Sequence, residues 1–250
     1  MKQLLLLIAL GASSLAHAQE QVERKHVRFI PLGELPVWKE DVKGGIRVQR
    51  KAPEGALPPS NVTYSQGDEV RSLRFSLRSF SDLAVFPGSA EGIILKEGEG
   101  AAGKEFLKSA MPASPLSLGV LFRDNKAMTW EKPQMLLLRD DADAFPVGKM
   151  RFVNVSDKTV VIQMAGVAAF GVAPGKTSLK SIKVGDTAIK VGYMTADGGS
   201  KAIWQNNVKV QRGQRVQCFF YKAQGKNPRE AVKFHTSPES VPSLPRPRTR

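Results

Sequence analysis

The stretch KMRFVNVSDKTVVIQMA, residues 149–165, decides the fold class of this chain. Residues 149–155 and 159–165 are rich in Val, Ile, Met and Phe, and the polar triplet Ser156-Asp157-Lys158 separates them. Two β-forming segments on either side of a short polar break are typical of antiparallel strands joined by a turn. The stretch therefore predicts a β-hairpin.

Segments of the same kind continue toward the C-terminus at spacings near ten residues. Further strands are predicted at 170–172, 178–184, 187–195, 202–210 and 215–222. Turn signals divide them, including Ala173-Pro174-Gly175 and the glycine-containing run 196–200. Many short strands with regular turns are typical of an antiparallel β-sandwich.

The first half of the chain shows the same two-residue period. In residues 71–80, Leu73, Phe75 and Leu77 alternate with polar side chains, as a half-buried strand requires. Two apolar strands are predicted at 116–123 and 134–139, and the best helix candidate is 104–110, which ends before Pro112. We therefore predict an all-β protein with two antiparallel sandwich-like domains and little helix.

The domain boundaries follow from shifts in composition. An acidic, proline-containing stretch at 140–146 is the expected linker between an N-terminal β domain at 26–139 and a C-terminal β-sandwich domain at 146–223. Residues 236–250 form a basic, proline-rich tail with little apolar surface to offset the entropy of ordering, and we expect this tail to be disordered.

Two short similarities raise the question of an internal duplication. The segment HVRFI at 26–30 resembles KMRFV at 149–153, and the turns at 52–55 and 173–175 follow these segments at comparable distances. Either one sandwich domain is duplicated, or two unrelated sandwiches share common strand patterns.

The N-terminus has the three parts of a secretory signal peptide. Residues 1–18 comprise a charged start at Lys2, an apolar run at 4–10, and small residues that end in Ala16-His17-Ala18. The run is shorter than the ~20 residues that span a bilayer, which disfavours an uncleaved anchor. We expect cleavage near Ala18, a periplasmic or secreted location, and no transmembrane segment afterwards.

Charge and cysteine content narrow the class of protein. The formal net charge is +14, and loss of Lys2 with the signal peptide leaves +13. This charge favours an anionic envelope polymer or an envelope protein as partner, the alternative being a solvated positive surface. Cys218 is the single cysteine, so no intramolecular disulfide can form, which favours a bacterial envelope protein. Cys218 shares a predicted strand face with Val216 and Phe220, which indicates a buried, inert thiol.

One motif imitates a nucleotide site. Residues 98–104, GEGAAGK, fit the glycine-rich phosphate loop, but Glu105 stands where that loop needs Ser or Thr. The chain also lacks the alternating strands and helices of a parallel α/β sheet. We expect a plain glycine-rich loop and no nucleotide or other cofactor.

Metal and nucleophile patterns are equally weak. His26, His235 and Cys218 do not have zinc-ligand spacing. The acidic run with Asp140, Asp141 and Asp143 lacks the glycine and terminal glutamate of a calcium loop, which favours a solvated linker. No metal site and no catalytic residue is assigned.

Two sets of side chains are candidates for binding surfaces. Aromatic rings that could stack on sugars, or that could instead lie in the core, are Trp38, Trp130, Tyr193 and Trp204. Basic side chains on one predicted strand, suited either to an anionic polymer or to protection of a sheet edge, are Arg71, Arg74 and Arg78. Neither set identifies a ligand.

Residues 145–156, FPVGKMRFVNVS, and the later turn at 173–175 carry a resemblance to a known group. Over residues 134–222 the chain resembles uncharacterised exported bacterial β-sandwich proteins. The resemblance implies a sandwich fold and an envelope location, without catalytic residues. In size, basicity and two predicted sandwiches, the chain also resembles periplasmic pilus chaperones at the level of architecture.

These observations favour a non-catalytic exported envelope protein that binds or scaffolds an envelope component. One alternative is a periplasmic assembly chaperone that acts by β-strand addition, which an uncovered apolar strand edge would favour. Another is a glycan-active enzyme, which an open cleft with paired carboxylates would favour.

Overall fold

A computed structural model describes residues 24–36, 40–49, 53–98, 102–124, 129–225 and 228–242. In these ranges the secondary structure consists of strands without helix, as predicted, and no helix is available to cross a membrane. The predicted signal peptide, Trp38 and the last eight residues of the predicted tail lie outside the described residues.

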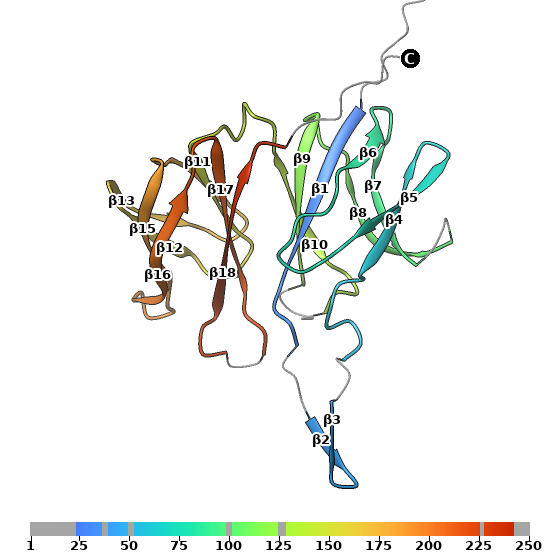
Figure 1. Ribbon diagram of the computed structural model, residues 1–250, viewed down its shortest axis with the longest axis horizontal. Helices are drawn as coiled ribbons and strands as arrows, with labels where there is room; N and C mark the ends of the chain where they lie inside the picture. The colour runs from blue at the N-terminus through green and yellow to red at the C-terminus, as the bar shows by residue number, and fades with distance from the viewer. Residues whose placement is uncertain are drawn as a thin grey trace, which may run out of the picture.

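The N-terminal half forms two sheets and a small hairpin (Figure 1). The inner N-sheet has the order β10-β9-β1-β6, and the outer N-sheet has the order β5-β4-β7-β8. The strands are β1 Arg24–Leu32, β2 Glu40–Lys43, β3 Ile46–Gln49, β4 Asn61–Gln66, β5 Glu69–Arg74, β6 Ala84–Pro87, β7 Gly92–Glu97, β8 Lys104–Ala110, β9 Leu116–Phe122 and β10 Gln134–Arg139. The β2–β3 hairpin projects away from both sheets.

The C-terminal half forms two further sheets. The inner C-sheet has the order β14-β11-β17-β18, and the outer C-sheet has the order β13-β12-β15-β16. The strands are β11 Lys149–Asn154, β12 Val160–Met164, β13 Val167–Val172, β14 Thr177–Ser181, β15 Gly185–Met194, β16 Ser200–Val210, β17 Gln214–Lys222 and β18 Val232–Ser240. The predicted strands of this half are therefore confirmed, with small shifts at their ends. The hairpin predicted at 149–165 is wrong, because β11 and β12 lie in different sheets and face each other across the core, where Phe152 and Ile162 both pack.

The two sandwiches have the same connectivity. If β1 is matched with β11, and β4–β10 are matched in order with β12–β18, every neighbour in the sheets of one half has its counterpart in the other. In both halves the first strand pairs in parallel with the next-to-last strand, and the other pairs are antiparallel. The β2–β3 hairpin is an insertion in the first copy. This shared topology supports duplication, and it matches residues 26–30 with 149–153.

The second similarity suggested by the sequence does not fit this match. The described part of the 52–55 turn precedes β4, whereas the 173–175 turn joins β13 to β14. Because the counterpart of the β13–β14 connection is the β5–β6 connection, these two turns are not equivalent.

Three apolar cores hold the four sheets in the layer order outer N, inner N, inner C, outer C. One core includes Phe29, Leu73 and Phe106, within the N-terminal sandwich. A second core includes Phe152 and Val191, within the C-terminal sandwich. The third core lies between the two inner sheets. The central strands of both inner sheets are therefore buried on both faces, and their near-continuous apolar sequences reflect this.

Three further local predictions need correction. Residues 104–110 form β8 rather than a helix, and a register shift leaves Phe106 as an extra residue between Glu105 and Leu107. Such a bulge buries the adjacent Phe106 and Leu107 together and removes the strict two-residue period. The strand predicted at 71–80 ends at Arg74, and Arg78 has a positive φ of 62° in the following turn.

The third correction concerns the C-terminal boundary. β18 lies beyond the predicted domain end at 223 and includes 236–240, the first residues of the predicted disordered tail. It pairs with β17 along its whole length, from Lys222↔Val232 to Gln214↔Ser240.

Candidate functional site

The junction between the two sandwiches has an apolar half and a charged half. Buried residues of the apolar half come from the inner faces of both domains: Ile30, Leu32, Leu118, Val120, Val153, Val155, Phe219 and Tyr221. Phe80 of the N-terminal domain meets Phe219 of the C-terminal domain edge to face, with ring centroids 6.4 Å apart. The apolar half alone therefore joins two domains through well-packed side chains.

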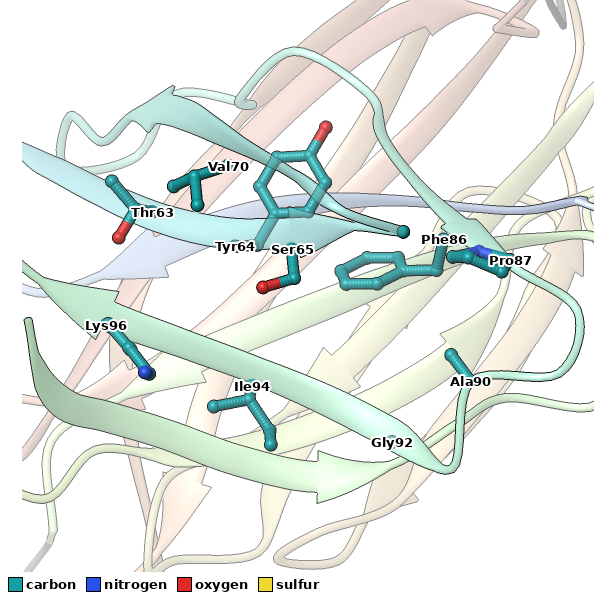
Figure 2. A pocket seen from close by; sticks show the side chains of 11 residues that line it. Thr63, Tyr64, Ser65, Val70, Phe86, Pro87, Ala90, Gly92, Ile94 and Lys96 are labelled. Atoms are coloured by element: carbon teal, nitrogen blue, oxygen red, sulfur yellow. The ribbon is translucent and has the colours of Figure 1, made fainter. Parts of the chain in front are cut away.

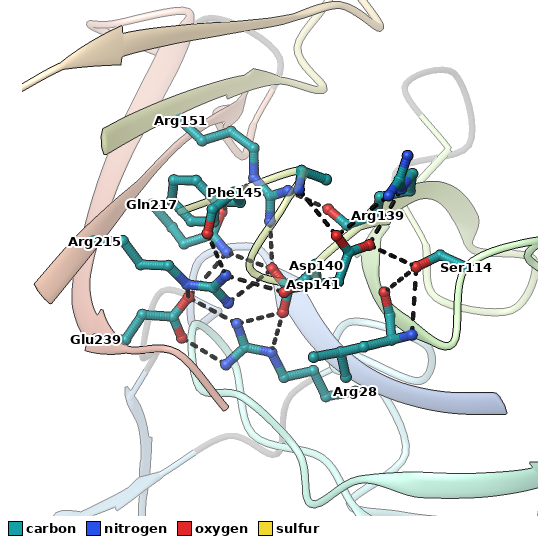
Figure 3. A network of polar contacts seen from close by, with 12 residues as sticks. Arg28, Ser114, Arg139, Asp140, Asp141, Phe145, Arg151, Arg215, Gln217 and Glu239 are labelled. Carbon is teal, nitrogen blue, oxygen red and sulfur yellow. Dashed lines mark hydrogen bonds and ion pairs between the residues drawn. The ribbon is translucent and has the colours of Figure 1, made fainter. Parts of the chain in front are cut away.

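The charged half surrounds Asp140, whose side chain is completely buried (Figure 3). Arg28 Nε donates to Oδ2 of Asp140 at 2.8 Å. On the other carboxylate oxygen, Arg151 Nη2 and Arg215 Nη2 donate at 2.7 and 3.0 Å. One carboxylate thus accepts from three arginines that lie on three different strands of both domains.

Glu239 is the second carboxylate of this cluster. Arg28 donates to both of its oxygens, at 2.5 and 2.7 Å, in a bidentate pair. Arg215 Nε and Gln217 Nε2 each donate to Oε1 at 3.1 Å. We call Arg28, Asp140, Arg151, Arg215, Gln217 and Glu239 the junction cluster. The buried charges are compensated by hydrogen bonds as well as by opposite charges, which a buried ion pair requires.

Aromatic rings cover the arginines of the junction cluster. The Phe145 ring lies 4.2 Å from the guanidinium carbon of Arg151 and 4.4 Å from that of Arg215. Phe80 covers Arg28 in the same way, at 4.1 Å. Arg215 also donates to the backbone carbonyls of Asp140 and Phe145, at 3.0 and 2.8 Å. The predicted linker is therefore bound into the junction.

The cluster follows the duplication of the fold. Arg28 and Arg151 are the central residues of the matched segments on β1 and β11. Asp140 directly follows β10, and Glu239 lies on β18, the matched strand. The two acids also lie opposite matched strands. Asp140 N donates to Leu116 O on β9 at 2.9 Å, and Glu239 lies opposite Arg215 on β17, the strand matched with β9.

Each domain thus contributes one arginine and one acid from matched positions, and each arginine reaches the other domain's acid. Arg28 binds Glu239 across the junction, and Arg151 binds Asp140. This exchange is the pattern of an isologous two-fold interface, in which the same patch of two similar units meets itself. Arg215 and Gln217 depart from the symmetry, because their counterparts are Leu116 and Leu118.

Burial and neighbouring charges shift the pKa values of Arg151 and Arg28 in opposite directions. Burial lowers the pKa of Arg151 to about 10, against the opposing charge of Asp140. Burial also disfavours the charged form of Arg28, but its contacts with Glu239 and Asp140 outweigh this and raise its pKa. Both side chains stay cationic at neutral pH, so the cluster acts as a permanent ionic clamp.

The acidic run at 140–143 is therefore not the solvated linker that its composition suggested. Asp140 belongs to the junction cluster, and Asp141 accepts from Ser114 Oγ at 2.8 Å and from Ala144 N at 2.9 Å. Burial opposes the charge on Asp141, but these bonds and Arg139 hold its pKa well below its usual range. In the described part of the chain, no group of three acidic, His or Cys side chains is arranged to hold a metal ion.

A second feature is a slot of about 340 Å³ in the N-terminal sandwich, between β4 and β7 (Figure 2). The side chains of Tyr64 and Phe86 form its floor, with ring centroids 5.1 Å apart. Residues at its mouth are Thr63, Ser65, Val70, Ile94 and Lys96. The slot combines an apolar floor with an open mouth, which suits a ligand side chain.

The aromatic candidates from the sequence fall in the cores. Trp130 is 2% exposed and Tyr193 is 7% exposed, and both pack among apolar side chains. Trp204 is partly buried and contacts Phe234, with ring centroids 4.8 Å apart. These three rings are therefore core residues rather than a sugar platform.

The other candidates also find places in the fold. Arg71 and Arg74 are exposed on β5, an edge strand of the outer N-sheet, and Arg71 pairs with Glu69. The predicted glycine loop joins β7 to β8, and residues 99–101 of it lie outside the described residues. His26 and His235 lie on β1 and β18.

Cys218 is fully buried in the C-terminal core, as predicted, and burial raises the pKa of its thiol. Because the thiolate is the reactive form, we expect the native protein not to react with a thiol-specific colorimetric reagent at pH 8. Unfolding in guanidinium chloride should release one reactive thiol per chain. Rapid reaction of the native protein would show that Cys218 is accessible.

Sequence reasoning missed the junction cluster, although one signal was present. Arg28 and Arg151 each interrupt an apolar strand at the same place in two similar segments. A charged residue repeated inside two buried strands requires a buried partner. The partners, however, lie more than a hundred residues from Arg28 in sequence and follow only from the sheet order.

The sequence matches no known family model, and no curated protein matches it either.

Proposed function

We propose that this is a non-catalytic exported protein of the bacterial envelope that binds or scaffolds an envelope component. The observation that carries the proposal is the junction, which joins two sandwiches through a buried apolar core and the junction cluster. Export rests on the predicted signal peptide, and the envelope component is the kind of partner that the positive charge favours.

The junction supports a scaffold because it holds two surfaces at a fixed separation. Domains of one chain usually move relative to each other unless their interface is large and apolar. Opening this junction would expose apolar strands and break the ion pairs of the cluster that cross it, in which Arg28 binds Glu239 while Arg151 and Arg215 bind Asp140 (Figure 3). The outer sheets of both sandwiches therefore present their faces in a constant geometry.

The paired carboxylates of the cluster support the same proposal. Asp140 and Glu239 bind the same two arginines, Arg28 and Arg215, and Asp140 is completely buried. A glycosidase pair must instead protonate or attack a substrate between the two carboxyl groups. This acid pair has the contacts of a structural clamp.

The test is recovery of an envelope component by the tagged mature chain, crosslinked in its native envelope fraction. The comparison variant replaces four exposed basic residues by glutamate: Arg74, Lys108, Lys190 and Lys209. We expect the wild-type chain to recover a component that the variant does not, and recovery should fall with added salt, because exposed charges are screened. Equal recovery by both proteins would overturn the proposal of a charge-directed binder.

A further inference from the structure

We propose that the slot between β4 and β7 is an acceptor site for an extended peptide, which adds to the outer N-sheet as a short strand. The inference deepens the proposed function, on which it rests for the role of a binding protein, by naming the chemistry of a partner. Its occupant is a segment with an apolar side chain that points into the sheet and an acidic side chain that points outward.

The first observation is that β4 and β7 separate after a short paired region. In the described part of the chain their ladder consists of Val62↔Glu97 and Thr63↔Lys96, although β4 continues to Gln66 and β7 begins at Gly92. Figure 2 shows the two strands diverging, with Phe86 between them. The outer N-sheet thus opens where two strand edges face each other.

The C-terminal sandwich provides an internal reference. Its matched strands, β12 and β15, pair over five residue pairs, from Val160↔Tyr193 to Met164↔Ile189. The same fold therefore closes this seam when nothing holds it open. On the inner face β12 carries the aliphatic residues Val160, Ile162 and Met164, where β4 has Tyr64 packed against Phe86. The opening belongs to the N-terminal copy.

The second observation concerns backbone groups. Gln66 and Glu69 close a two-residue turn in which Gly67 has a φ of +64°. Hydrogen-bonded and non-hydrogen-bonded pairs alternate along an antiparallel ladder, so the N–H and C=O of Ser65 point away from β5 and toward the slot. Two residues before Lys96, Ile94 points its own groups toward the slot by the same alternation. An occupant that supplies backbone donors and acceptors satisfies both edges, as in strand addition.

Side chains at the slot specify the rest of the occupant. Ile94 and Val70 are 39% and 42% exposed at its mouth, and the aromatic floor lies below them. In a strand, alternate side chains face opposite sides, so one guest side chain can contact Phe86 and Tyr64 while its neighbours face outward. Lys96 lines the same slot and favours an acidic neighbour.

The test uses the full mature chain and a bead-bound pool of end-blocked heptapeptides. Their pattern is Thr-X-Thr-X-Glu-X-Thr, with Val, Ile, Leu, Phe or Tyr at each X. We expect saturable binding by pool members, and hydrogen exchange should slow at Ser65 and Ile94 when the tightest member binds. The Ile94→Glu variant should bind that peptide at least tenfold more weakly. The matched control is Leu179→Glu, at a residue with 41% exposure on β14, which should bind within twofold of the wild type.

A second peptide separates strand addition from simple apolar contact. It has the tightest member's side chains, but N-methyl groups on alternate amides remove donors of the ladder. It is made in two versions, one for each set of alternate amides. Neither version should bind. Equal binding of this peptide, or the absence of saturable binding by every pool member, would overturn the inference. If Ile94→Glu still recovers the envelope component and no peptide binds, the proposed function stands without the acceptor site.

Discussion

Replacement of Asp140 by asparagine is expected to lower the free energy of unfolding by about 3–5 kcal/mol, the range measured when one partner of a buried ion pair is removed. The neutral amide keeps the shape of the side chain but removes the charge that all three arginines bind. Arg28 and Arg215 keep Glu239 as an acidic partner, whereas Arg151 loses the carboxylate that it binds in the junction cluster. Urea denaturation at neutral pH, followed by circular dichroism, measures the loss.

The matched control for this prediction is Asp143→Asn, in the same acidic run. Asp143 is exposed, so its replacement should change stability by less than about 0.5 kcal/mol. The two variants lose the same charge, and the difference between them reports the burial of Asp140. If both variants had the stability of the wild type, Asp140 would not be holding the junction.

Most of the strands follow from the sequence because a two-residue period is a local property. The two strands within 149–165 and the strand at 134–139 needed no information from elsewhere in the chain. The pairing of the first two did, because β11 and β12 lie in different sheets and do not form the predicted hairpin. Residues 104–110 could not be assigned in this way, since the bulge beside Leu107 depends on pairing with β7. β18 was missed for a similar reason, because its mixed polar sequence becomes a strand through its partner β17.

The junction cluster was beyond local reasoning for a different reason. Asp140 and Asp143 look alike in the sequence, yet one is completely buried and the other is exposed. What separates them is the position of Asp140 directly after β10, beside the arginines of β1, β11 and β17. The composition of the run predicted a linker throughout. The sheet order instead places Asp140 at the centre of the junction cluster.

Truncation of Phe219 to alanine is expected to cost about 3–5 kcal/mol and to uncouple the two sandwiches. Phe219 is fully buried between the inner sheets, where it meets Phe80 of the other domain. Its loss leaves a cavity in the core that joins the domains. We expect the wild-type chain to unfold in one calorimetric transition and Phe219→Ala to unfold in two.

The next residue along β17 provides the comparison. Phe220 is equally buried but faces the core of its own sandwich, where it stacks on Phe234 with centroids 5.1 Å apart. Phe220→Ala should lose a similar free energy while the junction stays intact, so the two sandwiches should still unfold together. Because the two variants remove the same side chain from opposite faces of one strand, two transitions in Phe219→Ala alone would show that the junction couples the domains. Two transitions in the wild-type chain would contradict the proposal of a rigid scaffold.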